Sequence, residues 1–264
     1  MVDSLILKLD PPVRGVILDM DGVLWRDTQA IVDIPWILET FQANHIKVSF
    51  ATNNATKSVE QYQKKLREFG AEVQSWQIIN SSMATSQLLL ERFPSGGPIY
   101  IIGEESLVKH LANNGFYISE ETAVAVIVGL DTNISFAKLR KANSLIRHGA
   151  IFIGTNPDLT YPTPEGLGPG SGAIIAAVEA ASGVKPIIAG KPQPTMMQIA
   201  MRRMNTTPQD TLVIGDRLET DILGGQRAGC RTALVLSGVT ALEDAQKWSP
   251  PPNLIVPDLR SLLV

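Results

Sequence analysis

The segment from Val16 to Trp25 constrains the fold of this chain more than any other stretch. It begins with an apolar run rich in β-branched residues, which predicts a strand buried inside a parallel sheet. Asp19 and Asp21 follow two residues apart, so their side chains point to the same face if the extended conformation continues. Gly22 then lets the chain turn sharply. Ligands of open α/β sheets bind at the carboxyl ends of the strands, so we expect a site at Asp19 and Asp21.

Two carboxylates at this spacing repel each other, and both charges are destabilised unless a cation or a shared proton relieves them. Considered alone, the pair fits a solvated acidic turn as well as it fits a metal-assisted nucleophile beside an acid/base group. The rest of the chain has to decide between these interpretations.

Length, charge and cysteine content exclude several classes of protein. The chain has 264 residues, enough for one large domain or two smaller ones, and a net charge of −3. That charge provides no basic surface for nucleic acid and no attraction to an anionic membrane. No apolar run reaches the roughly 18 residues needed to span a bilayer, no signal peptide is evident, and the single cysteine, Cys230, cannot form an internal disulfide. We therefore expect a cytoplasmic protein that binds neither nucleic acid nor membrane.

Strands and helices alternate along the chain, which predicts an α/β fold built on a doubly wound parallel sheet. The Pro/Gly-rich segment 94–98 interrupts this alternation, and a second α/β series follows it. A loop over 157–172 leads into a helix at 173–181, and a strand at 186–189 is expected to return to the first domain. We expect a core formed by residues 1–86 and 185–264, with an α/β domain inserted at 87–184. Four methionines at helical spacing predict core filling: Met196, Met197, Met201 and Met204.

Polar residues suited to binding a phosphoryl group follow four of the predicted strands. They are Asp19 and Asp21, Thr52 and Asn53, Lys191, and Asp216 with Asp221. Each has an ordinary explanation when considered alone: an acidic turn, an Asx turn, a solvated lysine, and a turn with a helix N-cap. Their shared position at the carboxyl ends of parallel strands favours a common site.

In these motifs the chain resembles the haloacid dehalogenase (HAD) superfamily. The matching segments are Asp19-Met20-Asp21-Gly22-Val23-Leu24-Trp25, Ala51-Thr52-Asn53-Asn54, Gly190-Lys191-Pro192 and Gly215-Asp216-Arg217-Leu218-Glu219-Thr220-Asp221. The insertion, with Thr155-Asn156-Pro157-Asp158, resembles subclass IIA, which contains p-nitrophenylphosphatase-like and NagD-like phosphatases. The resemblance implies a HAD-type Rossmann-like core with an α/β cap domain.

The residue types suit the hydrolysis of a phosphomonoester, which is very slow without catalysis. Asp19 is the expected nucleophile, forming an aspartyl-phosphate, and Asp21 the expected general acid and base. Lys191 would offset the repulsion between Asp19 and the phosphate. The resemblance implies Mg²⁺ bound by the Asp19 carboxylate, the Asp21 main-chain carbonyl and Asp216, with Asp221 nearby.

Further contacts to phosphate or substrate are expected from the loops. Thr52 can donate its hydroxyl, and backbone N–H groups near Gly22 and Asn53 can complete a phosphate cradle. Asn54 matches a family position that holds the catalytic carboxylates or contacts substrate. In the insertion, Asn156, Asp158 and Tyr161 are expected at the substrate-facing edge, although Tyr161 also fits an aromatic residue that packs on its own domain.

The resemblance implies a small phosphorylated metabolite as substrate, such as a sugar phosphate, nucleotide, glycerol phosphate or pyridoxal phosphate. It also leaves open a homodimer formed through the cap. Three alternatives to a hydrolase remain at this point. These are a phosphotransferase or mutase of the same superfamily, a receiver-like signalling module that is phosphorylated on aspartate, and a catalytically silent binding protein. The inserted domain argues against a receiver, and the retained catalytic residue types argue against a silent protein.

Overall fold

The computed structural model describes residues 4–163 and 166–264 and divides the chain into two compact units. The first unit contains residues 1–52, 59–79 and 191–264, and the second contains residues 53–58 and 80–190. Both are α/β, so the predicted fold class is confirmed. No helix within the described residues combines the length and the apolar character needed to cross a membrane.

The first unit is built on a six-stranded sheet with the order β15-β14-β13-β1-β4-β5. Its strands are β1 (Gly15–Leu18), β4 (Lys47–Thr52), β5 (Ile78–Asn80), β13 (Thr211–Gly215), β14 (Arg231–Val235) and β15 (Leu254–Val256). Strand β1 pairs in parallel with both β13 and β4, and β13–β14 and β14–β15 are also parallel. The central position of β1 brings the carboxyl ends of three strands next to one another at Asp19.

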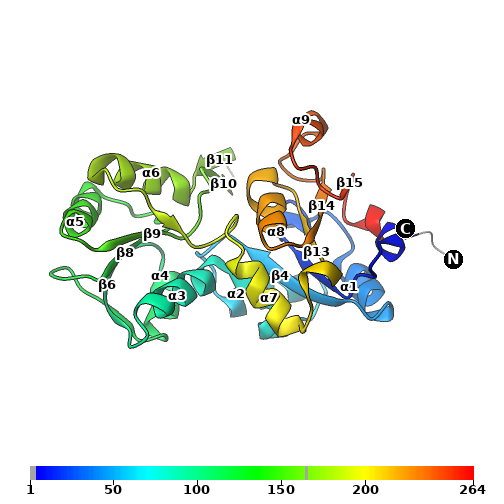
Figure 1. The fold of residues 1–264 in the computed structure, drawn as a ribbon, viewed down its shortest axis with the longest axis horizontal. Coiled ribbons are helices and arrows are strands. Elements are labelled where there is room, and N and C mark those ends of the chain that lie inside the picture. Colours follow the sequence, from blue (N-terminus) through cyan, green and yellow to red (C-terminus); the bar gives the residue numbers. More distant parts are fainter. Residues whose placement is uncertain (1–3, 164–165) are drawn as a thin grey trace. The chain divides into compact units, whose positions relative to one another are not determined.

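Alternate residues of β1 face opposite sides of this sheet, and both sides are covered by helices. Val16 and Leu18 belong to one apolar cluster with Ile37 and Phe41 of α1 (Ile34–Ala43) and with residues of α2 (Val59–Glu68). Contacts to the sheet also come from α7 (Thr195–Met204) and α8 (Leu223–Arg227) (Figure 1). The four methionines of α7 are buried, as their spacing predicts. Burial on both faces explains why β1 is apolar throughout rather than alternating.

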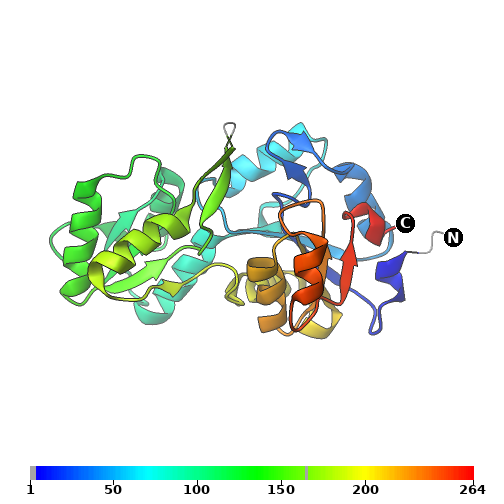
Figure 2. The same cartoon turned by 90° about the horizontal axis from the view of Figure 1, so that it is seen from above.

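Shorter elements complete the first unit. They are η1 (Leu5–Lys8), β2 (Trp25–Arg26), β3 (Gln29–Ala30), η2 (Ser75–Gln77), η3 (Pro208–Asp210), the π-helical turn η4 (Leu218–Ile222), α9 (Leu242–Lys247) and η5 (Arg260–Leu262). The two ends of the described chain lie side by side (Figure 2), where Ser4 Oγ donates a hydrogen bond to the carbonyl of Leu262 at 2.9 Å.

The second unit has a five-stranded sheet with the order β12-β9-β8-β6-β7. Its strands are β6 (Gly97–Ile102), β7 (Phe116–Ile118), β8 (Ala125–Val128), β9 (Ile151–Gly154) and β12 (Ile187–Ile188). Helices α5 (Phe136–Arg147) and α6 (Ser171–Ser182) lie on one side of this sheet, with α3 (Ser81–Arg92) and α4 (Glu105–Ala112) on the other (Figure 1). It is therefore a complete α/β layer structure with its own core.

Two local expectations for this unit were wrong. The strand expected to return to the first domain, β12, pairs instead with β9 of the five-stranded sheet. A two-residue apolar strand fits the edge of either sheet equally well, so its composition does not indicate its partner. The segment expected to be a loop forms a hairpin, β10 (Thr160–Thr163) with β11 (Gly166–Pro169). Both strands contain proline and β11 also contains glycine, and these residues hide the usual strand pattern because they are rare in strands except at edges.

Candidate active site

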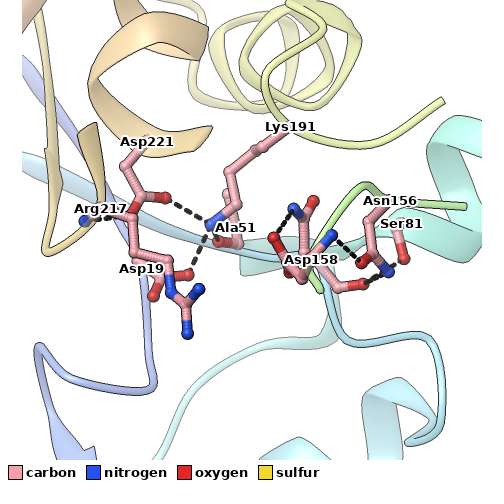
Figure 3. Close-up of polar contacts among 9 residues, drawn as sticks. Asp19, Ala51, Ser81, Asn156, Asp158, Lys191, Arg217 and Asp221 are labelled. Carbon is pink, nitrogen blue, oxygen red and sulfur yellow. Dashed lines mark hydrogen bonds and ion pairs between the residues drawn. The ribbon is translucent and has the colours of Figure 1, made fainter. Parts of the chain in front are cut away.

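The amino group of Lys191 is the centre of a buried charge cluster in the first unit (Figure 3). Its Nζ donates to Asp19 Oδ1 at 2.6 Å, to Asp221 Oδ1 at 2.6 Å and to the carbonyl of Ala51 at 2.8 Å. The side chains of Lys191 and Asp221 are 3% and 2% exposed, and that of Asp19 is 12% exposed. Three segments that are far apart in the sequence therefore meet at one ammonium group.

Asp216 and Asp221 follow β13, the strand next to β1. Asp216 Oδ2 accepts a hydrogen bond from the backbone N–H of Val239 at 2.8 Å, whereas its Oδ1 is buried without a partner among the described residues. Asp221 Oδ2 accepts from the backbone N–H of Arg217 at 3.1 Å. The π-helical turn η4 starts directly after Arg217 and places Asp221 back over the strand end.

Glycines allow the backbone to approach these carboxylates closely. A Cβ atom at Gly22, whose φ is +86°, would lie 2.5 Å from Asp216 Oδ2. A Cβ atom at Gly215 would lie 2.2 Å from the Asp221 Cβ atom. No side chain fits in either position, so the glycines are required by the packing around the acidic residues.

The carboxylates of this cluster destabilise one another. Burial raises the pKa of Asp19 well above its ordinary value, and Asp221 and Asp216 raise it further, while Lys191 opposes them. Burial, with Asp221, raises the pKa of Asp216 to about 7. Burial alone would lower the pKa of Lys191, but the attraction of Asp19 and Asp221 outweighs it and raises that pKa. Three carboxylates and one ammonium group leave two negative charges when all are ionised, which is the charge that one divalent cation neutralises.

The donor set fits a magnesium ion. One oxygen from each of Asp19, Asp216 and Asp221 lies within 4.8 Å of the other two. Two oxygens of an octahedral Mg²⁺ site with bonds of about 2.1 Å are separated by about 3 to 4 Å, so small side-chain movements would bring these atoms to one ion. The unpartnered Oδ1 of Asp216 is the atom with free capacity for such a ligand bond. All-oxygen donors are the ligands that magnesium prefers.

Asp21 lies on the loop after β1, and its carboxylate contacts Trp25. The indole Nε1–H donates to Asp21 Oδ1 at 2.7 Å, and the backbone N–H of Gly22 donates to the carbonyl of Trp25 at 2.8 Å. Ser237 Oγ donates to the carbonyl of Gly22 at 2.7 Å, which fixes the turn from a different loop. Thr52 is buried at the end of β4.

The remaining candidates belong to the second unit, which begins at Asn53. The carbonyl of Asn53 accepts from Asn156 Nδ2 at 2.8 Å and from Ser81 Oγ at 2.5 Å (Figure 3). Asn53 Nδ2 donates to Asp158 Oδ1 at 3.4 Å. Asn54 Oδ1 accepts from the N–H of Thr56 at 2.9 Å and forms an Asx turn. Tyr161 is half-buried in β10, paired with Gly168.

The structure thus gathers Asp19, Lys191, Asp216 and Asp221 in the first unit, and Asn53, Asn156 and Asp158 in the second. Sequence reasoning missed the polar partners Trp25 and Ser81 and the buried phenol of Tyr62. Trp25 falls inside the first motif, four residues after Asp21, but an indole in an apolar run is ordinarily interpreted as core. Tyr62 lies on α2, where its spacing with Leu66 indicates only a buried helix face.

Comparison with known proteins identifies the class to which this fold and site belong. The haloacid dehalogenase-like hydrolase family matches residues 16–117, and the HAD-hydrolase-like family matches residues 188–262. The 5'-nucleotidase YutF of Bacillus subtilis is 35% identical over 87% of this chain and 90% of its own length. The acid sugar phosphatase of Staphylococcus aureus is 33% identical over 95% of this chain and 96% of its own length.

Solved structures agree with these relatives. NagD from Escherichia coli K-12 is 32% identical, covers 96% of this chain and 98% of its own, and has a TM-score of 0.87. The 4-nitrophenylphosphatase from Thermotoga maritima is 33% identical with a TM-score of 0.89, covering 95% of this chain and 96% of its own. This chain therefore belongs to the HAD superfamily, in the NagD-like phosphatases of subclass IIA. It is a phosphoric monoester hydrolase with an α/β Rossmann-like core and a cap.

Proposed function

We propose that the protein hydrolyses the phosphomonoester of a small metabolite with Mg²⁺, through a covalent aspartyl-phosphate on Asp19. The observation that carries this proposal is the 2.6 Å contact between Lys191 Nζ and Asp19 Oδ1. It leaves Asp19 Oδ2 without a hydrogen bond from any described residue and therefore available to attack phosphorus. Burial raises the pKa of Asp19, and Lys191 opposes this rise and so favours the charged form of the carboxylate.

In the first step, Asp19 Oδ2 forms a bond to phosphorus and the ester P–O bond breaks. Asp21 gives its proton to the leaving alkoxide, so the alcohol departs neutral. In the second step, Asp21 takes a proton from water, the water oxygen bonds to phosphorus, and the bond between phosphorus and Asp19 breaks. Phosphate leaves and both carboxyl groups return to their starting state.

The residues proposed to hold Mg²⁺ are Asp19, Asp216 and the main-chain carbonyl of Asp21, with Asp221 beside them. When bound, the ion supplies positive charge that reduces the repulsion between the carboxylates and the phosphate dianion. A glycerol phosphate phosphatase from Mycobacterium tuberculosis, which is 32% identical with a TM-score of 0.88, was solved in complex with magnesium. It supports the same cofactor here.

Phosphate contacts are proposed from Thr52 and from the backbone near Gly22, Asn53 and Asn54. Selection among esters is proposed to belong to the second unit, through Asp158 and Tyr161. Asn156 would act through Asn53, because its amide is buried and donates to the Asn53 carbonyl. The names of the relatives, a 5'-nucleotidase, an acid sugar phosphatase and a glycerol phosphate phosphatase, support small phosphorylated metabolites as the substrate class.

Replacement of Asp19 tests the proposal. We expect Asp19→Asn to fold and to lose at least about a thousandfold of the Mg²⁺-dependent hydrolysis of p-nitrophenyl phosphate, because the covalent route disappears. Asp131→Asn is the matched control, since Asp131 is 4% exposed and bonded to Lys138 Nζ at 2.6 Å, and it belongs to the second unit and not to the catalytic cluster. It should keep wild-type activity.

A trapping experiment tests the intermediate. In an acid quench during turnover, the phosphoryl group should be found covalently bound to the Asp19 carboxylate, and phosphate released in ¹⁸O-water should carry one ¹⁸O because water attacks phosphorus. Phosphate release without any trapped phosphoprotein would contradict a covalent route. Release of phosphate from a panel of phosphorylated metabolites, with and without Mg²⁺ and with added alcohol acceptors, would separate hydrolysis from phosphoryl transfer.

A further inference from the structure

The side chain of Trp25 contacts the carboxylate proposed as general acid and base. Its indole Nε1–H donates to Asp21 Oδ1 at 2.7 Å. Trp25 is fully buried, so water cannot replace this hydrogen bond on the indole side. The backbones of the two residues also meet, because Asp21 and Trp25 form a β-bridge and the N–H of Gly22 donates to the Trp25 carbonyl at 2.8 Å.

The indole is held rigidly by its neighbours. It stacks on Phe69 with ring centroids 5.7 Å apart and an interplanar angle of 19°. Lys65 Nζ lies 4.2 Å from the indole centroid, and the same atom donates to the carbonyl of Asp27 at 2.9 Å. A stacked ring and a nearby cation each stabilise an indole by roughly 1 kcal/mol, and complete burial also restricts the ring, so the N–H direction is fixed before substrate binds and does not depend on the stack alone.

The contact gives the two carboxyl oxygens of Asp21 different roles. Indole N–H is a donor only, and a carboxylic acid accepts best at its carbonyl-type oxygen, so the proton is favoured on the oxygen that Trp25 does not bind. No described residue donates a hydrogen bond to Asp21 Oδ2 in the structure. Oδ1 is therefore the anchored oxygen, and Oδ2 is the one free to exchange a proton.

We propose that Trp25 is a positioning residue that fixes the rotation of the Asp21 carboxyl group and directs its proton-bearing oxygen toward the leaving group. This inference rests on the proposed function, since it assigns Trp25 a part in the proton transfer by Asp21. The positioning role of Trp25 is distinct from a packing role, because packing requires only the indole ring, whereas positioning requires its N–H.

The dependence on leaving group separates the two roles. A p-nitrophenolate leaves readily without a proton, whereas an alkoxide needs one, and a general acid contributes about 10² to 10⁴ in rate. In Trp25→Phe, we expect kcat/KM to fall about tenfold or more for alkyl phosphates such as glycerol phosphate. For p-nitrophenyl phosphate, kcat/KM should fall by less than about threefold. The parameter kcat/KM is used because it reports formation of the phosphoenzyme and excludes its hydrolysis.

Phe69→Leu is the matched control, since it removes the stacking and keeps the indole N–H. Its effect on kcat/KM should be the same for aryl and alkyl phosphates. Because Trp25→Phe also leaves a cavity, a second variant carries benzothienylalanine at position 25, which replaces N–H by sulfur in a ring of nearly the same shape. It should show the selective loss on alkyl phosphates without the cavity that the phenylalanine variant leaves.

Equal losses on aryl and alkyl phosphates, or an unchanged profile in the benzothienylalanine variant, would overturn the positioning role while leaving the proposed function intact. A wild-type protein without phosphatase activity would overturn the proposed function and this inference together.

Discussion

Lys191 Nζ lies 2.6 Å from Asp221 Oδ1, and both side chains are almost completely buried. The same ammonium group contacts Asp19 at 2.6 Å, so one cation holds a carboxylate from each of two neighbouring strand ends. Because one buried cation neutralises two carboxylates, the charge balance of the cluster depends on Lys191.

Removal of Lys191 should therefore be costly for stability as well as activity. Lys191→Met leaves buried carboxylates without their counter-charge, and breaking one partner of a buried pair costs about 3–5 kcal/mol. We expect a loss of this size by urea denaturation, with about half recovered in Lys191→Met/Asp221→Asn. Lys109→Met is the comparison, because Lys109 and Glu105 are 70% and 77% exposed in their pair and the loss of this pair should have little effect on the free energy of unfolding. Equal costs for the two single variants would contradict the central role of Lys191.

The raised pKa of Asp216 predicts an unusual pH dependence. Burial and Asp221 raise this pKa from 3.8 to about 7 in the folded protein. The native state therefore binds the proton more tightly than the unfolded state, and the stability this confers is lost as pH rises from about 4 to 7. Without metal, unfolding free energy should fall over this range, by at most about 4 kcal/mol from this residue.

Unfolding in EDTA at pH 5 and pH 8 measures this effect. In Asp216→Asn, the unfolding free energy should change less with pH, because the titrating group is gone. Mg²⁺ should raise the melting temperature of the wild type more at pH 8 than at pH 5, where protons compete for the carboxylates, and should do little for Asp216→Asn. A wild type whose metal-free stability rises steadily with pH would contradict the assignment.

Two glycines with nearly the same backbone angle allow a matched test of the crowding around Asp216. Gly22 has a φ of +86° and Gly70 a φ of +81°, so alanine is strained to a similar degree at both. A Cβ atom at position 22 would lie 2.5 Å from Asp216 Oδ2, whereas one at position 70 would be 3.3 Å from Pro35 Cγ.

Gly22→Ala should lose at least about tenfold in phosphatase activity, because it displaces a ligand oxygen, and Gly70→Ala should lose about 1–2 kcal/mol of stability with normal activity. Both are measured by p-nitrophenyl phosphate turnover and urea denaturation. Normal activity in a folded Gly22→Ala variant would show that Asp216 tolerates displacement.

The Asn156 amide should contribute to the stability of the second unit. Its Nδ2 donates to the Asn53 carbonyl, and its Oδ1 accepts from the Asp158 N–H at 3.2 Å. Asn156→Ala leaves buried partners unsatisfied, at a cost of about 1–3 kcal/mol. Asn114→Ala, which removes one hydrogen bond to the His110 carbonyl, should cost less. Thermal unfolding compares the two, and an Asn156→Ala variant as stable as Asn114→Ala would count against this network.

Much of the first unit could be predicted from the sequence, because its signals are local. The apolar run of β1 and the helical spacing in α1 and α7 indicate type and position directly, since burial on a fixed face imposes a period on the chain. The motifs at Asp19 and Asp216 could be assigned to strand ends for the same reason, and their meeting follows from the rule that parallel strands of one sheet end at a common edge. The contact of Lys191 with Asp19 does not follow from this rule, because the preceding strand β12 pairs with β9 in the other sheet.

Other features depended on pairing between distant segments, which local periodicity does not encode. Strand β12 joins the sheet of β9, and the hairpin β10–β11 forms where proline and glycine suggested a loop. The role of a single side chain can also be hidden in the sequence. A buried tryptophan such as Trp25 is interpreted as part of the core until the direction of its N–H is known. The sequence by itself determined the main strands and helices of the first unit and the acidic strand ends, because those follow from local periodicity and residue chemistry. Only the tertiary structure decided which buried polar atoms meet, because a hydrogen bond depends on distances and directions between residues that folding brings together.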